Sequence, residues 1–139
     1  MDVGSCTVTE EQLVALEPGR CHDQFLEVIW RQGGGIGEAT ILEPGDSSGA
    51  GCVRGVARLV EHILEGKHGE FLEYVIEKGP YPVSYNRARV TFTASGDGTL
   101  VTWTSNFTPY FGLGWVLPWV VRTAYRKMLK TLVDSVEAS

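Results

Sequence analysis

The sequence has no hydrophobic run that approaches the ~20 apolar residues an α-helix needs to cross a bilayer. Its first residues, MDVGSCTVTEEQ, also lack the basic segment and the apolar stretch of a secretory signal. We therefore expect no stable membrane insertion, and a cytoplasmic location is the matching expectation.

The sequence is also poor in cysteine. Cys6, Cys21 and Cys52 are odd in number, widely spaced and never arranged as C-x-x-C. This spacing argues against a disulfide framework and against a structural zinc site. The three histidines complete no metal-binding pattern with these cysteines, so we expect no metal and no cofactor.

An excess of positive charge is absent too. The chain has 12 basic and 17 acidic residues, a net charge of -5 and a pI near 5.1. This balance gives no broad attraction to phosphate backbones, so nucleic acid is disfavoured as a partner. The segment RQGGGIGEA (31–39) lacks both the G-x-G-x-x-G and the G-K-[ST] patterns of nucleotide sites. It predicts instead a loop that closes a pocket.

No internal repeat, low-complexity segment or long linker divides the chain. Its 139 residues, 43% hydrophobic and 21% charged, suffice for one ordinary globular core. We predict a single domain over residues 1–139.

Alternation of apolar and polar residues indicates strands. The segment 70–79 shows it clearly, because Leu72, Tyr74 and Ile76 fall on one face and charged residues on the other. The sequence SGDG (95–98) predicts a hairpin turn. The other predicted strands are 5–16, 38–45, 52–66 (two strands with a tight reversal), 84–95 and 96–107.

Two segments have helical periodicity instead. Residues 21–31 form a short amphipathic pattern, and residues 117–136 form a long one with apolar residues every three or four positions. Pro118 is tolerated only in the first turn of the second helix. The order of elements predicts an α+β fold in which an antiparallel sheet wraps around the terminal helix.

Four segments, followed by the long helix, resemble the polyketide cyclase/dehydrase branch of the START-like, Bet v 1-like (SRPBCC) superfamily. They are GCVRGVAR (51–58), EHILE (61–65), FLEYVIEKGPYPVSYNRARVTF (71–92) and GTLVTWTSNFTP (98–109). The resemblance runs from about residue 21 to the end. It implies a helix-grip fold, with short helices after the first strand and an apolar cavity between the sheet and the C-terminal helix. Members bind hydrophobic small molecules, and some catalyse cyclisation or dehydration without a cofactor.

Trp103 is the one large side chain in the predicted strand 96–107. It shares a face with Val101, Ser105 and Phe107, so that face should look inward. A buried indole either packs as ordinary core against the terminal helix or provides a flat wall for a ligand ring. In a helix-grip fold these two roles largely coincide, and both remain open.

Arg54 and Glu61 match a G-x-x-R element and a strand-opening glutamate of the family. If their strands pair as a hairpin, the two side chains meet on the concave side of the sheet, as a buried charge requires a partner. Two interpretations follow. The pair is a salt bridge that fixes strand register, or Arg54 polarises a ligand carbonyl while Glu61 holds it or acts as a base. Tyr74 is the third candidate catalytic residue, and His22 is a weaker acid or base candidate.

We expect ligand contacts from residues on the inward faces and at the strand ends, with ordinary packing as the alternative for each. The predicted ligand-binding residues are Trp30, Arg54, Tyr74, Asn86, Trp103, Phe107, Tyr110, Trp119 and Val121.

Three functions compete at this point. The first is binding of a polyketide-, lipid- or aromatic-like molecule in the cavity, and the second adds cyclisation or dehydration of that molecule. The third is a non-catalytic carrier or adaptor that uses an exposed aromatic patch. The segment GLGWVLPW (112–119) contains Trp115 and Trp119 and predicts a lid, a membrane-touching edge or the patch of a homodimer.

Overall fold

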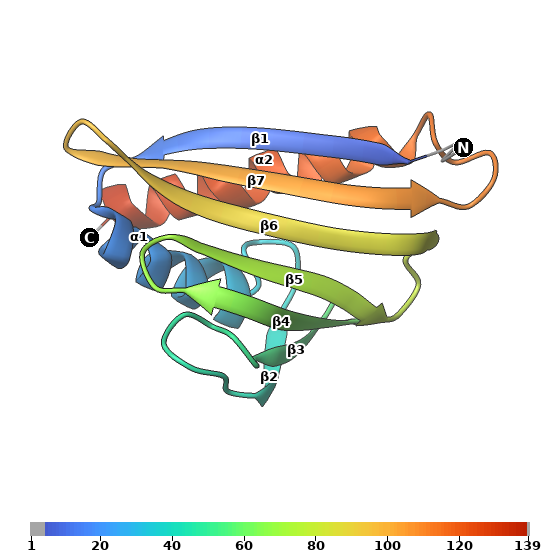
Figure 1. The fold of residues 1–139 in the computed structure, drawn as a ribbon, viewed down its shortest axis with the longest axis horizontal. Coiled ribbons are helices and arrows are strands. Elements are labelled where there is room, and N and C mark those ends of the chain that lie inside the picture. Colours follow the sequence, from blue (N-terminus) through green and yellow to red (C-terminus); the bar gives the residue numbers. More distant parts are fainter. Residues whose placement is uncertain (1–4, 139) are drawn as a thin grey trace.

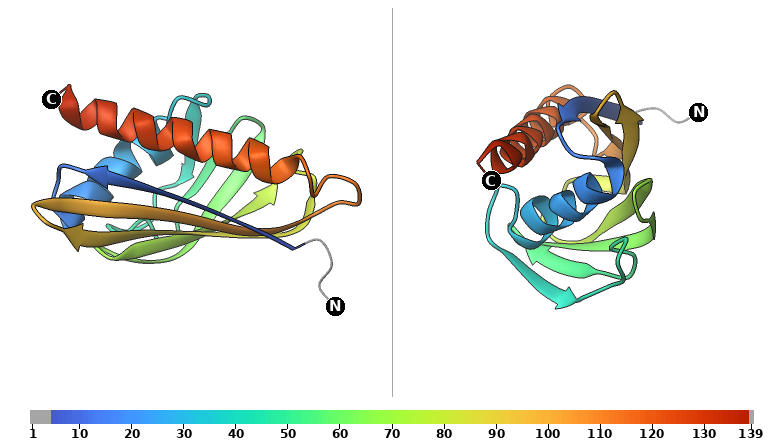
Figure 2. Two further views of the ribbon diagram at one scale, coloured as in Figure 1. Left: turned by 90° about the horizontal axis from the view of Figure 1, so that it is seen from above. Right: turned by 90° about the vertical axis from the view of Figure 1, so that its left-hand side faces the viewer.

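A curved antiparallel sheet grips one long helix (Figure 1). The structure is a computed structural model that describes residues 5–138, so residues 1–4 and 139 of the predicted domain lie outside the described residues. Figure 2 shows the sheet curled around its contents, with the helices on its concave side. The predicted α+β class and helix-grip arrangement are confirmed.

The sheet has seven strands in the order β1-β7-β6-β5-β4-β3-β2, and all neighbours are antiparallel. The strands are β1 (Cys6–Val14), β2 (Ala39–Glu43), β3 (Val53–Val56), β4 (Leu59–Lys67), β5 (Phe71–Lys78), β6 (Val83–Ser95) and β7 (Gly98–Pro109). The helical elements are α1 (Pro18–Phe25), the π-helix η1 (Leu26–Arg31) and α2 (Leu117–Glu137).

The alternation in β7 separates its two faces as predicted. Val101, Trp103, Ser105 and Phe107 are all buried on the inner face, whereas the intervening threonines are partly exposed. In the neighbouring strand β6, Val90 lies opposite Trp103 in the register. Because apolar residues recur with a period of two in both strands, one continuous apolar surface faces the helices.

The helix α2 closes this surface. Its buried stripe has the three- and four-residue spacing of one helix face: Leu117, Val121, Tyr125, Met128, Leu129 and Leu132. Pro118 lies in the first turn, where no helical hydrogen bond is lost. No helix among residues 5–138 is long and apolar enough to cross a membrane.

A partly exposed ionic contact joins the edge strand β1 to α2. Glu10 lies opposite Trp103 in the β1–β7 register and so points to the concave side. Its carboxylate receives Arg122 at 3.3 Å and Arg126 at 2.8 Å. These arginines remain accessible to solvent, so we assign the contact a role in orienting α2 rather than a large stabilisation.

The first helical segment starts earlier than predicted, at Pro18 instead of residue 21, and changes type at Leu26. In η1 the amide of Gln32 bonds to the carbonyl of Glu27, five residues before it. The glycine run then turns the chain back. Gly33 is required there, because a Cβ at this position would lie 1.7 Å from the carbonyl oxygen of Gly37.

The reversal predicted inside 52–66 is a two-residue turn at Ala57 and Arg58. Both residues have positive φ, 50° and 68°, although neither is glycine or asparagine. A two-residue hairpin with positive φ at both positions matches the twist of the flanking strands. The pairing of β3 and β4 therefore holds Ala57 and Arg58 in a strained, left-handed backbone conformation.

His22 locks α1 to two loops. It is fully buried, its Nε2 lies 2.9 Å from the carbonyl of Ser48, and its Nδ1 accepts the amide of Gly69 at 2.9 Å. Since Nδ1 accepts, Nε2 must carry the proton, so the ring is neutral. Burial lowers the pKa of His22. The ring also stacks on Phe92 with centroids 4.5 Å apart.

This arrangement predicts a pH-dependent stability. The contribution of neutral His22 is fully present above the unfolded-state pKa, about 6.5, and is lost as the pH falls through the lowered folded-state pKa. His22→Gln should cost about 1 to 3 kcal/mol near pH 7 and should flatten the loss of stability between pH 7 and pH 5.5. Urea unfolding at a series of pH values measures both effects.

Thr99→Val is the control, because Thr99 is also fully buried, donates its hydroxyl to the carbonyl of Leu16 at 2.7 Å and carries no titratable group. This variant should lose stability but keep the pH dependence of the wild type. If His22→Gln retains that dependence as well, the assignment of the loss to His22 is wrong.

Candidate ligand-binding cavity

A cavity of about 300 Å³ lies between α2 and the inner face of the sheet. Its base is buried, and its rim includes the exposed residues Pro80 and Val120. It therefore has a mouth between the β5–β6 connection and the start of α2. The lining residues are Ile36, Arg54, Leu59, Glu61, Tyr74, Ile76, Pro80, Tyr81, Pro82, Trp103, Leu117, Val120, Val121, Ala124, Tyr125 and Met128.

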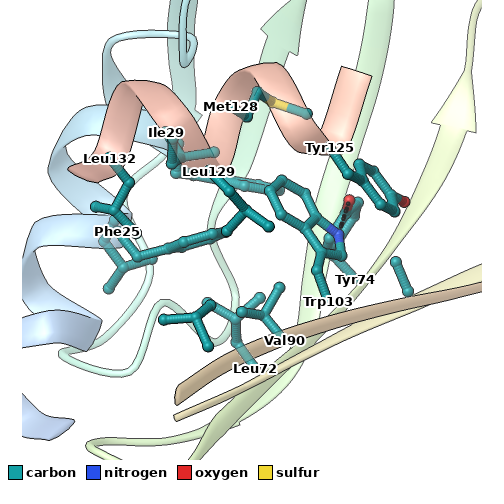
Figure 3. Close-up of a cluster of buried hydrophobic side chains, with 14 of the residues drawn as sticks. Phe25, Ile29, Leu72, Tyr74, Val90, Trp103, Tyr125, Met128, Leu129 and Leu132 are labelled. Carbon is teal, nitrogen blue, oxygen red and sulfur yellow. Dashed lines mark hydrogen bonds between the residues drawn. The ribbon is translucent and has the colours of Figure 1, made fainter. Parts of the chain in front are cut away.

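Trp103 serves both the core and the cavity wall. On one side its ring meets the edge of Phe25, with centroids 5.2 Å apart, and on another it stacks on Tyr125 at 4.2 Å. Its indole N–H donates to the hydroxyl of Tyr74 at 3.0 Å (Figure 3). Trp103 is therefore a core residue that also lines the cavity, and its contact with a ligand stays a prediction.

The pair Arg54 and Glu61 forms as the hairpin pairing predicts. The two residues are direct neighbours in the β3–β4 register and are 3% and 6% exposed. Nε of Arg54 donates to Oε1 of Glu61 at 2.7 Å, and Nη2 lies 2.6 Å from the same oxygen. This contact neutralises two charges that burial would otherwise make costly.

The second carboxylate oxygen of Glu61 has no hydrogen-bond partner among the described residues, since both arginine contacts use Oε1. Every buried side-chain nitrogen or oxygen in residues 5–138 has a hydrogen-bond partner. Because Oε2 has no such partner, it is not buried, and it is accessible from the cavity that Glu61 lines. It is an acceptor available to a ligand.

Arg54 also caps η1. Its Nη1 donates to the carbonyls of Ile29 and Trp30, both at 2.7 Å, at a helix end whose carbonyls have no helical partners. Three of its five N–H groups therefore donate hydrogen bonds. Nη2 makes the ionic contact to Glu61 and donates no hydrogen bond within the described part of the chain.

Three tyrosines gather near this ion pair. For Tyr74, burial raises the pKa well above its usual value, and the neighbouring Tyr125 and Glu61 raise it further. Burial also raises the pKa of Tyr81 and of Tyr125. All three phenols are therefore protonated near neutral pH. Tyr74 accepts from Trp103 and also shares a side-chain hydrogen bond with Tyr125.

Trp30 does not line the cavity, contrary to the position predicted for it. Its indole donates to Sγ of Cys52 at 3.0 Å, and the guanidinium of Arg54 lies over its ring at 4.2 Å. The reason is η1, which places the tryptophan behind Arg54. Its contacts hold the guanidinium in place, and Trp30 is not among the residues that line the cavity.

Asn86 is also placed outside the cavity wall. Strands β5 and β6 pair only as far as Tyr74 and Ala88 and then diverge. Asn86 fills the gap, because its amide accepts from the N–H of Ile76 at 2.7 Å and donates to the carbonyl of Ile76 at 3.0 Å. Its hydrogen bonds are thus used to join the strands. Tyr110 is exposed and lies with Asn86 around a separate small recess.

The other residues predicted to contact a ligand also lie partly inside and partly outside the cavity lining. Val121 lines the cavity, whereas Phe107 is buried in the core beside Tyr81, and Trp119 points to solvent with 66% of its surface exposed. His22 is held by its two backbone partners and is not among the lining residues. Five predicted site residues therefore meet in one cavity: Arg54, Glu61, Tyr74, Trp103 and Val121.

The sequence reasoning missed several lining residues, of which Tyr125, Met128 and Tyr81 are the most informative. Tyr125 follows Val121 by four residues and precedes Leu129 by four, so the helical stripe contains the signal. Tyr81 lies between two prolines that hold it at the end of β5. No cluster of three histidine, cysteine or acidic side chains suited to a metal occurs in residues 5–138.

Solved structures with the same fold cover nearly the whole chain. The protein XoxI from Bacillus cereus has a TM-score of 0.79 and 18% identity over 94% of this chain and 95% of its own. Ara h 8.0201 has a TM-score of 0.77 and 17% identity over 98% and 100%. Norcoclaurine synthase from Thalictrum flavum, solved with dopamine and hydroxybenzaldehyde, has 0.72 and 14% over 96% and 87%. The molecule is thus a Bet v 1-like helix-grip protein.

The family described as polyketide cyclase / dehydrase and lipid transport matches residues 22–137. The chain therefore belongs to this family, within the SRPBCC superfamily, as the sequence resemblance indicated. No significant match is found among curated proteins. Membership of the family implies a cavity for hydrophobic ligands, and the space beside Trp103 lies between sheet and helix where such a cavity is expected.

The geometry of Arg54 predicts an asymmetric response to mutation. Arg54→Met removes the partner of buried Glu61 and the cap of η1, and should destabilise the protein by about 3 to 5 kcal/mol. The double variant Arg54→Met/Glu61→Leu should recover part of that loss, because no buried charge remains. Denaturant unfolding of both single variants and the double variant measures the coupling.

Recovery should be incomplete, since the carbonyls of Ile29 and Trp30 still lack their donor. If the effects of the two single variants simply add, the pair is not energetically coupled and the interpretation of a register-fixing salt bridge fails.

Proposed function

We propose that the protein binds one small, ring-containing hydrophobic molecule that carries a hydroxyl or similar polar group at one end. The observation that carries this proposal is the division of the cavity into an apolar wall and a single polar corner. Aromatic and aliphatic side chains of β7 and α2 form the wall, and the Oε2 atom of Glu61 lies at the corner.

The size of the space supports a small ligand. A volume of about 300 Å³ lies at the lower end of the range of about 300 to 1,000 Å³ for small-molecule sites. The aromatic side chains that line the cavity favour a planar ring, because stacked and edge contacts between aromatic rings add to the hydrophobic effect. Norcoclaurine synthase, which has the same fold, was solved with dopamine and hydroxybenzaldehyde, both aromatic molecules with a hydroxyl group.

The polar corner complements a ligand that both donates and accepts. Glu61 provides an acceptor, and Nη2 of Arg54, which donates no hydrogen bond among the described residues, provides a donor. A buried polar group disfavours a ligand that leaves it unpaired, so these two groups favour a polar end over a purely apolar molecule.

Native mass spectrometry of the protein purified from its own cells tests the proposal. We expect the wild type to carry a hydrophobic small molecule, and Ala124→Trp to lose it, because Ala124 lines the cavity and the indole fills the space. Loss of the bound mass should be accompanied by unchanged or higher stability, since the new side chain buries apolar surface.

Thr123→Trp is the matched control, because Thr123 is the adjacent helical residue and is exposed to solvent. This variant should keep the bound molecule. Retention of the same mass in Ala124→Trp, or its loss in both variants, would contradict a site in this cavity.

The polar corner is tested with 2-naphthol and naphthalene, two bicyclic probes that differ by one hydroxyl. The wild type should bind 2-naphthol roughly tenfold more tightly, as expected for one hydrogen bond to a charged acceptor. Glu61→Gln should reduce that preference. Displacement of a fluorescent hydrophobic dye measures both affinities.

Arg87→Leu serves as the control, because Arg87 lies on the outer face of the sheet and pairs with Glu73 at 2.6 Å. It should leave the preference unchanged at comparable stability. Equal effects of the two variants would remove Glu61 from the proposed contact.

Catalysis of a cyclisation or dehydration is a second candidate, favoured by the available Oε2 of Glu61 and the protonated phenol of Tyr74 in one cavity. In this proposal Glu61 removes a proton next to a ligand carbonyl that Arg54 polarises. Tyr74 donates its proton to the leaving hydroxyl, which departs as water, and the proton on Glu61 restores the phenol. Orientation and exclusion of water supply the rate enhancement, without a cofactor.

A further inference from the structure

Tyr81 belongs to the connection between β5 and β6 and lines the cavity near its mouth. It lies between the exposed Pro80 and the half-buried Pro82, and it is itself half-buried. Its ring packs beside the inward-facing Phe107 of β7, with centroids 6.4 Å apart. The side chain therefore extends from the connection over the inner face of the sheet.

The hydroxyl group of Tyr81 faces polar groups of the cavity. Burial raises its pKa, and after burial the largest causes are the neighbouring Tyr125 of α2 and Glu61 of β4. Both of these residues line the cavity. Tyr81 also borders the outer recess beside Asn86. Its polar end, however, lies on the inner side of the sheet, where the two groups that affect it are found.

This hydroxyl has no hydrogen-bond partner among residues 5–138. The other two tyrosines of the cavity differ, because Tyr74 and Tyr125 bond to each other and Tyr125 also bonds to Ser105. Every buried side-chain oxygen of the described residues has a partner, so the unpaired oxygen of Tyr81 is accessible. Since it is protonated near neutral pH, it is an available hydrogen-bond donor.

The backbone of the connection orients this donor. Pro80 and Pro82 have fixed φ angles, and Pro82 also restricts the backbone of the residue before it, Tyr81. The N–H of Tyr81 donates to the carbonyl of Gly79 at 2.8 Å, and its own carbonyl accepts from the N–H of Val83 at 2.8 Å. A donor that is oriented before binding reduces the entropy that a ligand contact costs.

Tyr81 and Glu61 present opposite hydrogen-bonding characters at different depths of the cavity. Glu61 is only 6% exposed and lies at the base, whereas Tyr81 lies beside the rim residue Pro80. A ligand whose hydroxyl donates to Glu61 therefore meets a second donor nearer the mouth. The group that matches this donor is an acceptor such as a carbonyl oxygen. A carboxylate is disfavoured, because a second buried anion near Glu61 would be costly.

We propose that Tyr81 determines specificity by donating a hydrogen bond to a carbonyl oxygen at the outer end of the ligand, while Glu61 accepts from a hydroxyl at its inner end. The ligand class is thus a neutral, hydroxylated ring compound with a ketone or similar carbonyl group at its other end. This inference rests on the binding function proposed above. A site that bonds to both ends rejects analogues that lack either polar group.

Two probes with one bicyclic ring test the proposal. The first, 6-acetyl-2-naphthol, has a hydroxyl and a carbonyl at opposite ends, and 6-ethyl-2-naphthol lacks the carbonyl. The wild type should bind the acetyl probe roughly three- to tenfold more tightly, as expected for one hydrogen bond. Tyr81→Phe removes only the hydroxyl, so it should lose most of this preference and keep its affinity for the ethyl probe. Displacement of a fluorescent hydrophobic dye measures the affinities.

Infrared spectroscopy of the bound acetyl probe, labelled with ¹³C at its carbonyl, reports the hydrogen bond directly. The C=O stretch should have a higher frequency in Tyr81→Phe than in the wild type, because a donated hydrogen bond weakens the C=O bond. A residue that only shapes the cavity would not move this frequency. Urea unfolding of Tyr81→Phe should match the wild type, because the hydroxyl has no partner among the described residues.

Tyr85→Phe is the matched control, because Tyr85 is exposed and is not among the residues that line the cavity. It should keep both the preference and the frequency of the wild type. The proposal is overturned if Tyr81→Phe keeps either of them, or if Tyr85→Phe loses the preference equally. Binding of both probes without a preference removes the role of Tyr81 and leaves the proposed function standing. If neither probe binds, the proposed function fails and this inference fails with it.

Discussion

The buried guanidinium of Arg54 is the contact on which the rest of the structure depends. A single side chain fixes the register of β3 and β4 through Glu61, caps η1 at the carbonyls of Ile29 and Trp30, and forms one wall of the cavity. A charge in the protein interior needs polar partners, so the guanidinium holds Glu61 and the two carbonyls in their positions. The sheet and the helical segment are therefore joined by a polar contact, while the apolar core supplies most of the stabilisation.

The charges of Arg54 and Glu61 are not fully compensated on the side that faces the cavity, and this leaves polar atoms there for a ligand. The hydrogen bond from Nε of Arg54 and the ionic contact of Nη2 both converge on Oε1 of Glu61, so Oε2 remains for whatever occupies the cavity. Trp103 has the same double character, since its N–H is satisfied by Tyr74 while its ring face packs on Tyr125. The same side chains thus form the core and line the cavity, and the cavity lies beside Arg54 and Glu61.

Much of this arrangement could be predicted from the sequence, for a definite physical reason. Two-residue alternation determines which face of a strand is buried, and pairing of adjacent strands then brings Arg54 to Glu61. The family resemblance added the cavity. The position of Trp30 could not be predicted, because η1 rotates side chains away from α-helical spacing. The turn at Ala57 and Arg58 was also unreadable, since neither residue favours positive φ and the strands impose it.

The two ends of the molecule differ in how firmly they are held, which determines where a ligand can exchange. At the far end, His22 bonds to two loops and stacks on Phe92 in a fully buried position. At the mouth, β5 and β6 have already diverged, and the amide of Asn86 bridges them. Local opening costs least where few buried contacts and backbone hydrogen bonds must be broken. The path of lowest cost therefore leads through the 79–82 connection and the start of α2, and the apolar core beneath Trp103 need not open.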